Sequence, residues 1–180
     1  MATTLASRLL DAAEALVAAG PRSSAFRRRA VSTAYYAVFH ALAKACADRF
    51  LPIDRNAREY ERVYRALDHG PLKSAAERER NDLLKGRQQI LDLLDLVVLL
   101  QGERERADYL PPVKNVFSYD RATELIGQAR LAVETIEALS DMDRDALAVC
   151  LIFKASPKER RPSAAGAAAR GPRVSGARPR

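Results

Sequence analysis

Apolar residues recur at every third or fourth position through most of this chain, which is the spacing that lets an α-helix bury one face. The stretch from Phe26 to Ala47 follows this pattern throughout. Because successive residues of a helix are about 100° apart, the stretch divides into an apolar face, a face of alanines and a polar face. We predict that this helix packs against neighbours on two sides and that the chain is organised around it. The apolar face comprises Val31, Tyr35, Val38, Phe39, Leu42 and Cys46, and the alanine face comprises Ala30, Ala34, Ala37, Ala41 and Ala45.

Four long helices account for most of the predicted fold. They cover about residues 3–19, the stretch from Phe26 on to about Phe50, 87–106 and 118–139, and residues that stop or cap helices mark their ends. Gly20-Pro21 stops the first, either Ser23 or Ser24 caps the second, and Ser118 caps the last of them. The helix at 87–106 is apolar all round from Leu96 to Leu100, which predicts a central helix enclosed by its neighbours. The first helix is predicted to bury Leu5, Leu9, Ala12, Ala13, Leu16 and Val17.

Shorter elements are predicted between and after these helices. Asn56 and Glu59 resemble a capping box that starts a helix ending at His69. The charged stretch 73–85 predicts a short helix with a solvated loop, and 108–116, which contains Pro111-Pro112, predicts a loop. A final short helix begins at Asp141 or Asp143 and runs to residue 153.

The predicted fold class is all-α, because glycine is scarce and Ala, Leu, Arg and Glu dominate. We expect an up-down helical bundle of four long helices plus one or two short ones in residues 1–153. Residues 154–180 consist mainly of Ala, Gly, Pro, Ser and Arg, which predicts a disordered basic C-terminal tail. The most apolar window, 90–100, is too short to cross a bilayer and contains two Asp. No positively charged start precedes an apolar segment. We therefore expect a cytoplasmic protein without a membrane partner.

The positive charge of the chain is concentrated in this tail. The chain has 30 Lys and Arg against 23 Asp and Glu, and residues 154–180 hold eight of the former and one of the latter. Residues 1–153 therefore hold 22 of each and have no net charge. The tail suits a flexible arm that attracts RNA, DNA or an acidic protein. A solubilising extension is the alternative, because the tail has no aromatic residue on which a base could stack.

Cysteine and histidine are too few for a predicted metal site. Cys46 and Cys150 lie in apolar helical stretches, with no second Cys or His at the spacing of metal ligands. We expect them to be buried free thiols in a reducing compartment, and we predict neither a metal nor a cofactor.

The polar face of the second helix is the most organised polar feature of the sequence. Arg29, Thr33, Tyr36 and His40 follow one another at i, i+4, i+7 and i+11, and so lie along one side of the helix. They could bind a phosphate or a nucleotide, with Arg29 supplying charge and Tyr36 a stacking surface. Alternatively, they form a polar seam between helices in which His40 bonds a carbonyl or a tyrosine hydroxyl. Arg27 and Arg28 precede these residues, and we expect both to lie on the solvent-exposed first turn of the helix.

Three short patterns resemble HEPN domains, which are small helical bundles. RRAVSTAYYAVFHAL at 28–42 resembles their second helix, YRALDHG at 64–70 the middle helix of one bacterial branch, and RADY at 106–109 a second signature of that branch. The resemblance implies a metal-independent ribonuclease with an Arg-x4-6-His motif, in which Arg holds the phosphate and His moves protons. It also implies a homodimer with a composite site, a toxin role, and a nucleotidyltransferase-type antitoxin as partner.

Arg62 and His69 have the spacing of that motif. They would share one face of a helix but stand about 10 Å apart along its axis, and His69 could equally cap a helix end. In HEPN nucleases the motif generally lies on a later helix than this one. At that place the present chain has GERERADY, which supplies Arg104, Arg106, Asp108 and Tyr109 without a following His. These residues could bind a substrate, or Asp108 and Tyr109 could lock the loop after the helix by pairing with an Arg.

Two functions follow from these patterns. One is a metal-independent ribonuclease or ribonuclease-like toxin, which His40 and His69 keep open. The other is a non-catalytic helical module that binds RNA, a nucleotide or a partner protein, and the missing His after Arg106 favours it. The apolar helix at 87–106 also suits a two-fold symmetric homodimer.

Overall fold

The computed structural model describes residues 4–51, 58–67, 72–80, 82–111 and 116–153. All regular structure in these residues is helical, which confirms the predicted all-α class. Three shorter helices accompany the four long ones, and each of them lies in a segment where a shorter helix was predicted. The elements are α1 (Leu5–Ala19), α2 (Ser24–Phe50), α3 (Arg58–Tyr64), α4 (Leu72–Glu79), α5 (Gln88–Tyr109), α6 (Tyr119–Ala138) and α7 (Asp141–Ile152).

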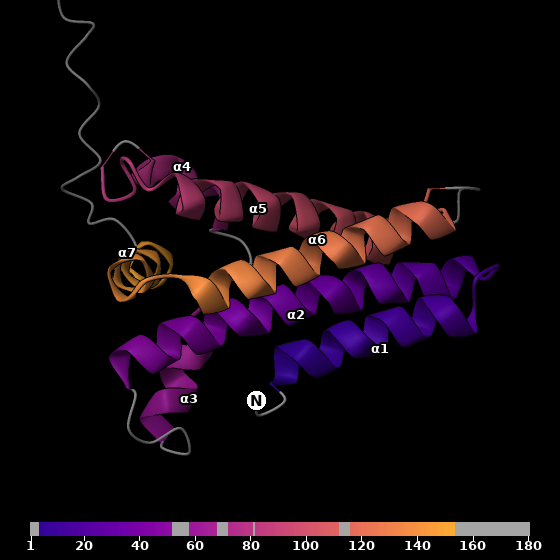
Figure 1. Cartoon of the computed structure of the whole chain (residues 1–180), viewed down its shortest axis with the longest axis horizontal. Helices are drawn as coiled ribbons and strands as arrows, with labels where there is room; N and C mark the ends of the chain where they lie inside the picture. Colours follow the sequence, from indigo (N-terminus) through magenta and orange to yellow (C-terminus); the bar gives the residue numbers. More distant parts are fainter. Residues whose placement is uncertain (1–3, 52–57, 68–71, 81, 112–115, 154–180) are drawn as a thin grey trace, which may run out of the picture.

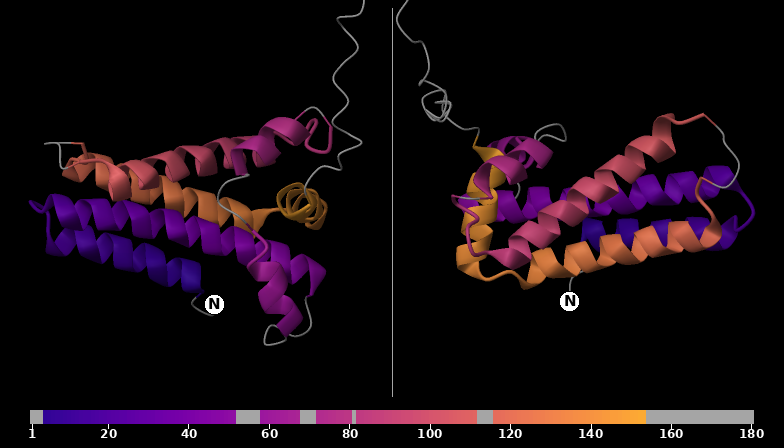
Figure 2. Two further views of the ribbon diagram at one scale, coloured as in Figure 1. Left: turned by 180° about the vertical axis from the view of Figure 1, so that it is seen from behind. Right: turned by 90° about the horizontal axis from the view of Figure 1, so that it is seen from above.

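Helix α2 is the centre of the arrangement. It contacts α1, α3, α5, α6 and α7. Helices α1, α2 and α6 lie side by side, and successive long helices point in opposite directions (Figure 1). Helix α5 crosses obliquely over α2 and α6 (Figure 2). Helix α3 extends away from the C-terminal end of α2, and α7 lies across the ends of the long helices (Figure 2). The prediction that the chain is organised around the second helix is therefore confirmed.

The two packing faces predicted for α2 are buried. Its alanine face lets neighbouring helices approach closely, because methyl side chains leave little to keep the helix axes apart. Each buried Leu or Val side chain on the apolar face stabilises the fold by roughly 1.5–3 kcal/mol. Of the predicted residues, Phe39 and Ala45 are only partly buried, and the others are buried: Ala30, Val31, Ala34, Tyr35, Ala37, Val38, Ala41, Leu42 and Cys46.

Side-chain caps begin four helices. Ser23, and not Ser24, caps α2 by accepting a hydrogen bond from the Phe26 amide, and Ser118 caps α6 as predicted. Thr4 caps α1 and Ser140 caps α7, and neither was predicted. Gly20 follows the last residue of α1 as predicted, and the position suits glycine because a Cβ there would lie 2.5 Å from Cγ of Phe26.

The predicted buried face of α1 is confirmed in part: Ala13 and Val17 are buried, and Leu9 and Leu16 pack partly buried against the core, whereas Leu5 and Ala12 are exposed. Leu5 is 45% exposed, and the buried residues are Ala6, Leu10, Ala13 and Val17. Helix α1 contacts both α2 and α6. Its buried face is therefore set by the groove between two neighbours, whose position the local periodicity does not contain.

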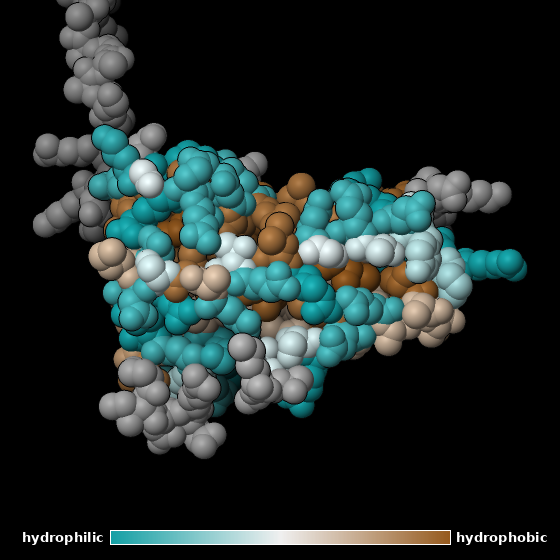
Figure 3. Space-filling view, viewed as in Figure 1, coloured by the Kyte–Doolittle hydropathy of each residue, from teal (hydrophilic) through white to brown (hydrophobic). Residues whose placement is uncertain are grey.

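Two expectations about α5 are corrected. Asp108 and Tyr109 do not lie in a loop, because α5 continues through Tyr109 and ends only at Leu110, the residue before a proline. The helix is also not enclosed. It packs against α2, α4 and α6, but Leu99 on its outer side is 43% exposed. Figure 3 shows apolar surface among polar groups over this side of the molecule.

The segment between α2 and α5 is only partly described. Helix α3 ends at Tyr64 and a turn follows at residues 65 and 66, so the described helix is shorter than predicted. Helix α4 matches the short helix expected within 73–85. Asn56, His69 and the basic tail lie outside the described residues. No described helix combines the length and the apolar character that crossing a membrane requires.

Candidate functional site

The last two turns of α5 carry a buried arginine that faces two tyrosines of α2. Arg104 is 8% exposed. Its guanidinium carbon lies 5.3 Å from the ring centroid of Tyr35 and 5.8 Å from that of Tyr36. At these distances the negative faces of the rings attract the cation. This contact joins the GERERADY pattern to the polar face of α2.

Asp108 completes this cluster one turn further along α5. Its Oδ2 atom lies 3.9 Å from Nε of Arg104, and its Oδ1 atom accepts a hydrogen bond of 2.5 Å from the hydroxyl of Ser32 on α2. Nε of Arg104 is buried and has no hydrogen-bond partner among the described residues. Arg104 and Asp108 therefore connect α5 to α2, while the Nε–H of Arg104 makes no hydrogen bond to the described residues.

The environment of this cluster keeps Tyr35 protonated. Burial raises the pKa of the Tyr35 phenol well above its usual value, while the charge of Arg104 and its hydrogen bond to Tyr35 act in the opposite direction. The burial effect prevails. Tyr35 is therefore a neutral phenol at physiological pH, able to donate as well as accept a hydrogen bond.

Arg28 is not on a solvated helix start. Its guanidinium donates to the main-chain oxygens of Ala107 at 3.2 Å, Leu110 at 2.7 Å and Pro111 at 2.8 Å. These are the carbonyls at the C-terminal end of α5, which carries partial negative charge and lacks helical partners. These three carbonyl groups therefore supply the hydrogen-bond acceptors for the Arg28 guanidinium.

Arg27 behaves in the same way at the neighbouring loop. Its Nε donates to the carbonyl of Phe117 at 2.6 Å, and its Nη1 donates to the carbonyl of Pro21 at 2.7 Å. The first contact joins α2 to the segment that enters α6. Both arginines at the start of α2 are therefore structural ties, and the expectation that they coat a solvated surface is wrong.

The polar stripe of α2 is divided between two neighbours. Tyr36 faces Arg104 on α5, whereas Nδ1 of His40 lies 2.8 Å from the hydroxyl of Tyr64 on α3. Thr33 donates to the carbonyl of Arg29 within its own helix at 2.8 Å, and Arg29 is exposed. These contacts are those of the polar seam, since His40 bonds a tyrosine hydroxyl.

His40 sits in a half-buried aromatic cluster. Its ring stacks on Tyr64 at 6.0 Å and meets Phe39 edge-on. Burial lowers the pKa of the His40 imidazole below its ordinary value of 6.5. The ring is therefore neutral near pH 7, the state in which an imidazole can accept a proton.

Helix α3 presents a separate basic surface. Arg58, Glu61, Arg62 and Arg65 line a hollow of about 460 Å³, in which Arg65 pairs with Glu61 at 3.1 Å. Arg58 and Arg62 lie one turn apart on one face of α3, and Arg65 continues that face in the turn that follows the helix. Tyr64 stands nearly opposite that face and contacts His40. Arg62 therefore points away from His40.

The remaining predicted site residues do not join either group. Arg106 pairs with Glu103 at 3.0 Å on the surface, and Tyr109 is 77% exposed, so Tyr109 does not lock the chain after α5. His69 lies outside the described residues, and its pairing with Arg62 stays a prediction. The described residues bring together Arg104 and Asp108 but form no Arg–His pair.

Sequence reasoning missed the partners of this cluster. Ser32 was not singled out, and Tyr35 was assigned to the apolar face without a polar role. The bond between Ser32 and Asp108 joins residues 76 positions apart, and no local pattern encodes a pairing over that distance. The spacing of Arg104 and Asp108 at i, i+4 was the one available indication.

Among the described residues, no group of three or more His, Cys, Asp and Glu side chains is arranged to hold a metal ion. Comparison of the chain with protein-family models, with curated proteins and with solved structures finds no match. The resemblance to HEPN domains therefore stays a prediction based on short patterns.

Proposed function

We propose that this chain is a helical RNA-binding module whose α3 contacts the phosphate backbone. The observation that carries the proposal is the face of α3, where Arg58, Arg62 and Arg65 surround an open hollow with a single acid, Glu61. Arginine matches phosphate through a planar fork of donors. Helix α3 also projects from the end of α2 (Figure 1), where a backbone could approach it.

Two further features support RNA as the ligand. The face of α3 stands out because residues 1–153 have no net charge, so its arginines are not part of a general positive excess. The predicted basic tail would add salt-sensitive attraction that is independent of sequence. The HEPN-like patterns in α2 and α5 point to the same class of ligand.

The proposal is tested by measuring RNA binding as a function of salt. Full-length protein is titrated into fluorescent single-stranded RNA, and the variant Arg58→Gln/Arg62→Gln/Arg65→Gln is compared with Arg8→Gln/Arg22→Gln/Lys85→Gln, which removes three exposed charges elsewhere. We expect the α3 variant to bind at least about tenfold more weakly and its salt slope to fall by about 2–3, because each lost phosphate contact removes about 0.7–0.9. Equal losses in both variants would exclude α3 as the contact.

A metal-independent ribonuclease is the second candidate. It is supported by His40, a half-buried imidazole that burial keeps neutral near pH 7 and whose Nδ1 is held by the Tyr64 hydroxyl, as an oriented base would be. A ribonuclease should cleave RNA in the presence of a chelator. Loss of this cleavage in His40→Gln, with cleavage retained in Arg58→Gln/Arg62→Gln/Arg65→Gln, would support this function. Intact RNA after prolonged incubation at high protein concentration would exclude it.

The wider setting follows from the resemblance. We propose a cytoplasmic homodimer, built on an up-down bundle of the four long helices with a disordered tail, that acts as the toxin of a toxin–antitoxin pair. A nucleotidyltransferase-type antitoxin is the partner that this resemblance implies. The same bundle without catalysis would serve as a nucleotide-binding or protein-interaction module for that partner.

A further inference from the structure

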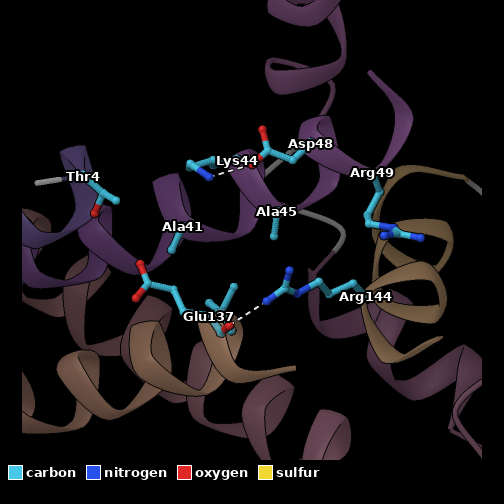
Figure 4. Close-up of a pocket in the computed structure, with 9 residues that line it drawn as sticks. Thr4, Ala41, Lys44, Ala45, Asp48, Arg49, Glu137 and Arg144 are labelled. Carbon is cyan, nitrogen blue, oxygen red and sulfur yellow. Dashed lines mark hydrogen bonds and ion pairs between the residues drawn. The ribbon is translucent and has the colours of Figure 1, made fainter. Parts of the chain in front are cut away.

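A pocket lies where α1 begins, α6 ends and α7 packs against the C-terminal half of α2. Its volume is about 310 Å³, near the lower end of the range for small-molecule sites. Figure 4 shows charged side chains around a floor of small apolar ones. The lining residues are Thr4, Ala41, Lys44, Ala45, Asp48, Arg49, Ile136, Glu137 and Arg144.

The charges on the α2 side of this pocket are already neutralised. Lys44 pairs with Asp48 at 2.6 Å, and the second oxygen of Asp48 accepts a hydrogen bond from the hydroxyl of Tyr60 at 2.9 Å. Arg49 is held by two carboxylates of α7, at 3.2 Å from Asp141 and 2.7 Å from Asp145. These groups therefore bring little net charge to a ligand.

Two opposite charges in the pocket lack a countercharge. Arg144 donates to the main-chain oxygen of Glu137 at 2.6 Å, but no carboxylate among the described residues forms an ion pair with it. The carboxylate of Glu137 likewise has no cationic partner in the described part of the chain. In Figure 4 the Glu137 carboxylate lies on the side of Thr4, and the Arg144 guanidinium lies on the opposite side of the pocket.

The geometry points to a site for a free α-amino acid or a zwitterion of similar size. Its carboxylate would accept hydrogen bonds from Arg144, whose guanidinium keeps donors unused by the Glu137 carbonyl. Its ammonium group would face the Glu137 carboxylate. A short apolar side chain would contact the floor formed by Ala41, Ala45 and Ile136.

The lining argues against a polyanion in this pocket. A nucleotide would bring several negative charges close to Glu137 and Asp48, and like charges in a partly enclosed site repel strongly. Glu137 is exposed and Arg144 partly exposed, so water solvates both charges in the absence of a ligand. A simple anion would gain an interaction only with Arg144, and a simple amine only with Glu137. A ligand that carries both charges satisfies both groups. This inference is independent of RNA binding, because α3 and the pocket are lined by different residues.

Calorimetric titration of the full-length protein with a panel of L-amino acids tests the proposal. We expect at least one amino acid to bind. The same molecule without its carboxylate (for L-valine, isobutylamine) and without its ammonium group (isovalerate) should each bind at least about tenfold more weakly. Inorganic phosphate serves as the probe for a simple anion site.

Matched variants locate the binding. Arg144→Gln and Glu137→Gln should each weaken binding of the amino acid by about tenfold or more. Arg8→Gln and Glu134→Gln, at exposed helix positions outside the pocket, should leave that affinity unchanged. Circular dichroism and the Tm of each variant show whether the fold persists. The proposal is overturned if no amino acid binds at about 10 mM, or if phosphate binds as well and Glu137→Gln strengthens it.

Discussion

Arg104 is a charged side chain placed where water reaches little of its surface. Removing a guanidinium from water costs on the order of several kcal/mol of free energy unless nearby groups compensate for the lost hydration. Three groups do so: the rings of Tyr35 and Tyr36 and the carboxylate of Asp108. The geometry is not saturated, because Nε has no hydrogen-bond partner among the described residues. Arg104 is therefore held by its hydrogen bond to Tyr35, by the two aromatic rings and by the charge of Asp108.

Replacing Arg104 tests this account. Arg104→Met keeps an apolar stem of similar length but removes the cation that contacts the rings of Tyr35 and Tyr36 and the carboxylate of Asp108. We therefore expect the free energy of unfolding to fall by about 1–3 kcal/mol. Arg106→Met is the matched control two residues later, where an exposed pair with Glu103 should cost less than about 1 kcal/mol. Urea unfolding followed by circular dichroism measures both. Similar costs for the two variants would show that burial of Arg104 contributes nothing special.

The residues that bear chemistry were recognisable from the sequence, whereas their partners were not. Arg104 and Asp108 were identified as candidates by type and position, and they meet. Tyr36 and His40 share a stripe on α2, yet they contact different helices. A stripe defines a direction on one helix only, and which neighbour lies in that direction depends on how the other helices pack.

At the scale of elements, small residues decide how closely segments approach. Alanines along α2 allow α1 and α6 to pack against it. Glycine acts at one turn in the same way: Gly20 ends α1 where the chain reverses into α2, and Phe26 occupies the space that a side chain would need. At Gly127, in the middle of α6, a Cβ would have no neighbouring atom within 4 Å.

These two glycines should respond to alanine with opposite signs. Gly20→Ala forces the Phe26 ring and the start of α2 to move, which should lower the free energy of unfolding by about 1–3 kcal/mol. Gly127→Ala should raise it by about 0.5–1 kcal/mol, because alanine loses less chain entropy in a helix than glycine. Thermal or urea unfolding of both variants gives the signs. A stabilising Gly20→Ala would mean that the α1–α2 turn is not tightly packed.

For the whole molecule, the outer side of α5 is the main departure from the predicted core. The helix was expected to be enclosed, yet Leu99 is exposed on it. Apolar residues on this side would be covered in the predicted homodimer, in which α5 of one copy meets the same surface of another across a two-fold axis. The interface would then account for the apolar character of residues 96–100.

Charge placed at Leu99 tests the homodimer. Leu99→Glu would bury two carboxylates close to the two-fold axis, so we expect a dimer to dissociate at least about a hundredfold more readily, equivalent to about 2.7 kcal/mol. Leu131→Glu, on the exposed side of α6 where Leu131 is 57% exposed, should leave the mass unchanged. Light scattering after size-exclusion chromatography measures the mass. A monomeric wild type over the accessible concentration range would contradict the homodimer.

The sequence by itself determined the elements of this protein: the helical class, the central position of α2, the approximate bounds of the long helices, the end of α1 at Gly20 and the start of α6 at Ser118. These depend on interactions between residues three or four positions apart, which repeat along the chain and can be read from it. Only the tertiary structure decided the face that α1 buries, the exposure of α5, the carbonyl contacts of Arg28 and the bond between Ser32 and Asp108. The physical reason is that such contacts join residues far apart in the chain, and each depends on how several helices pack at once.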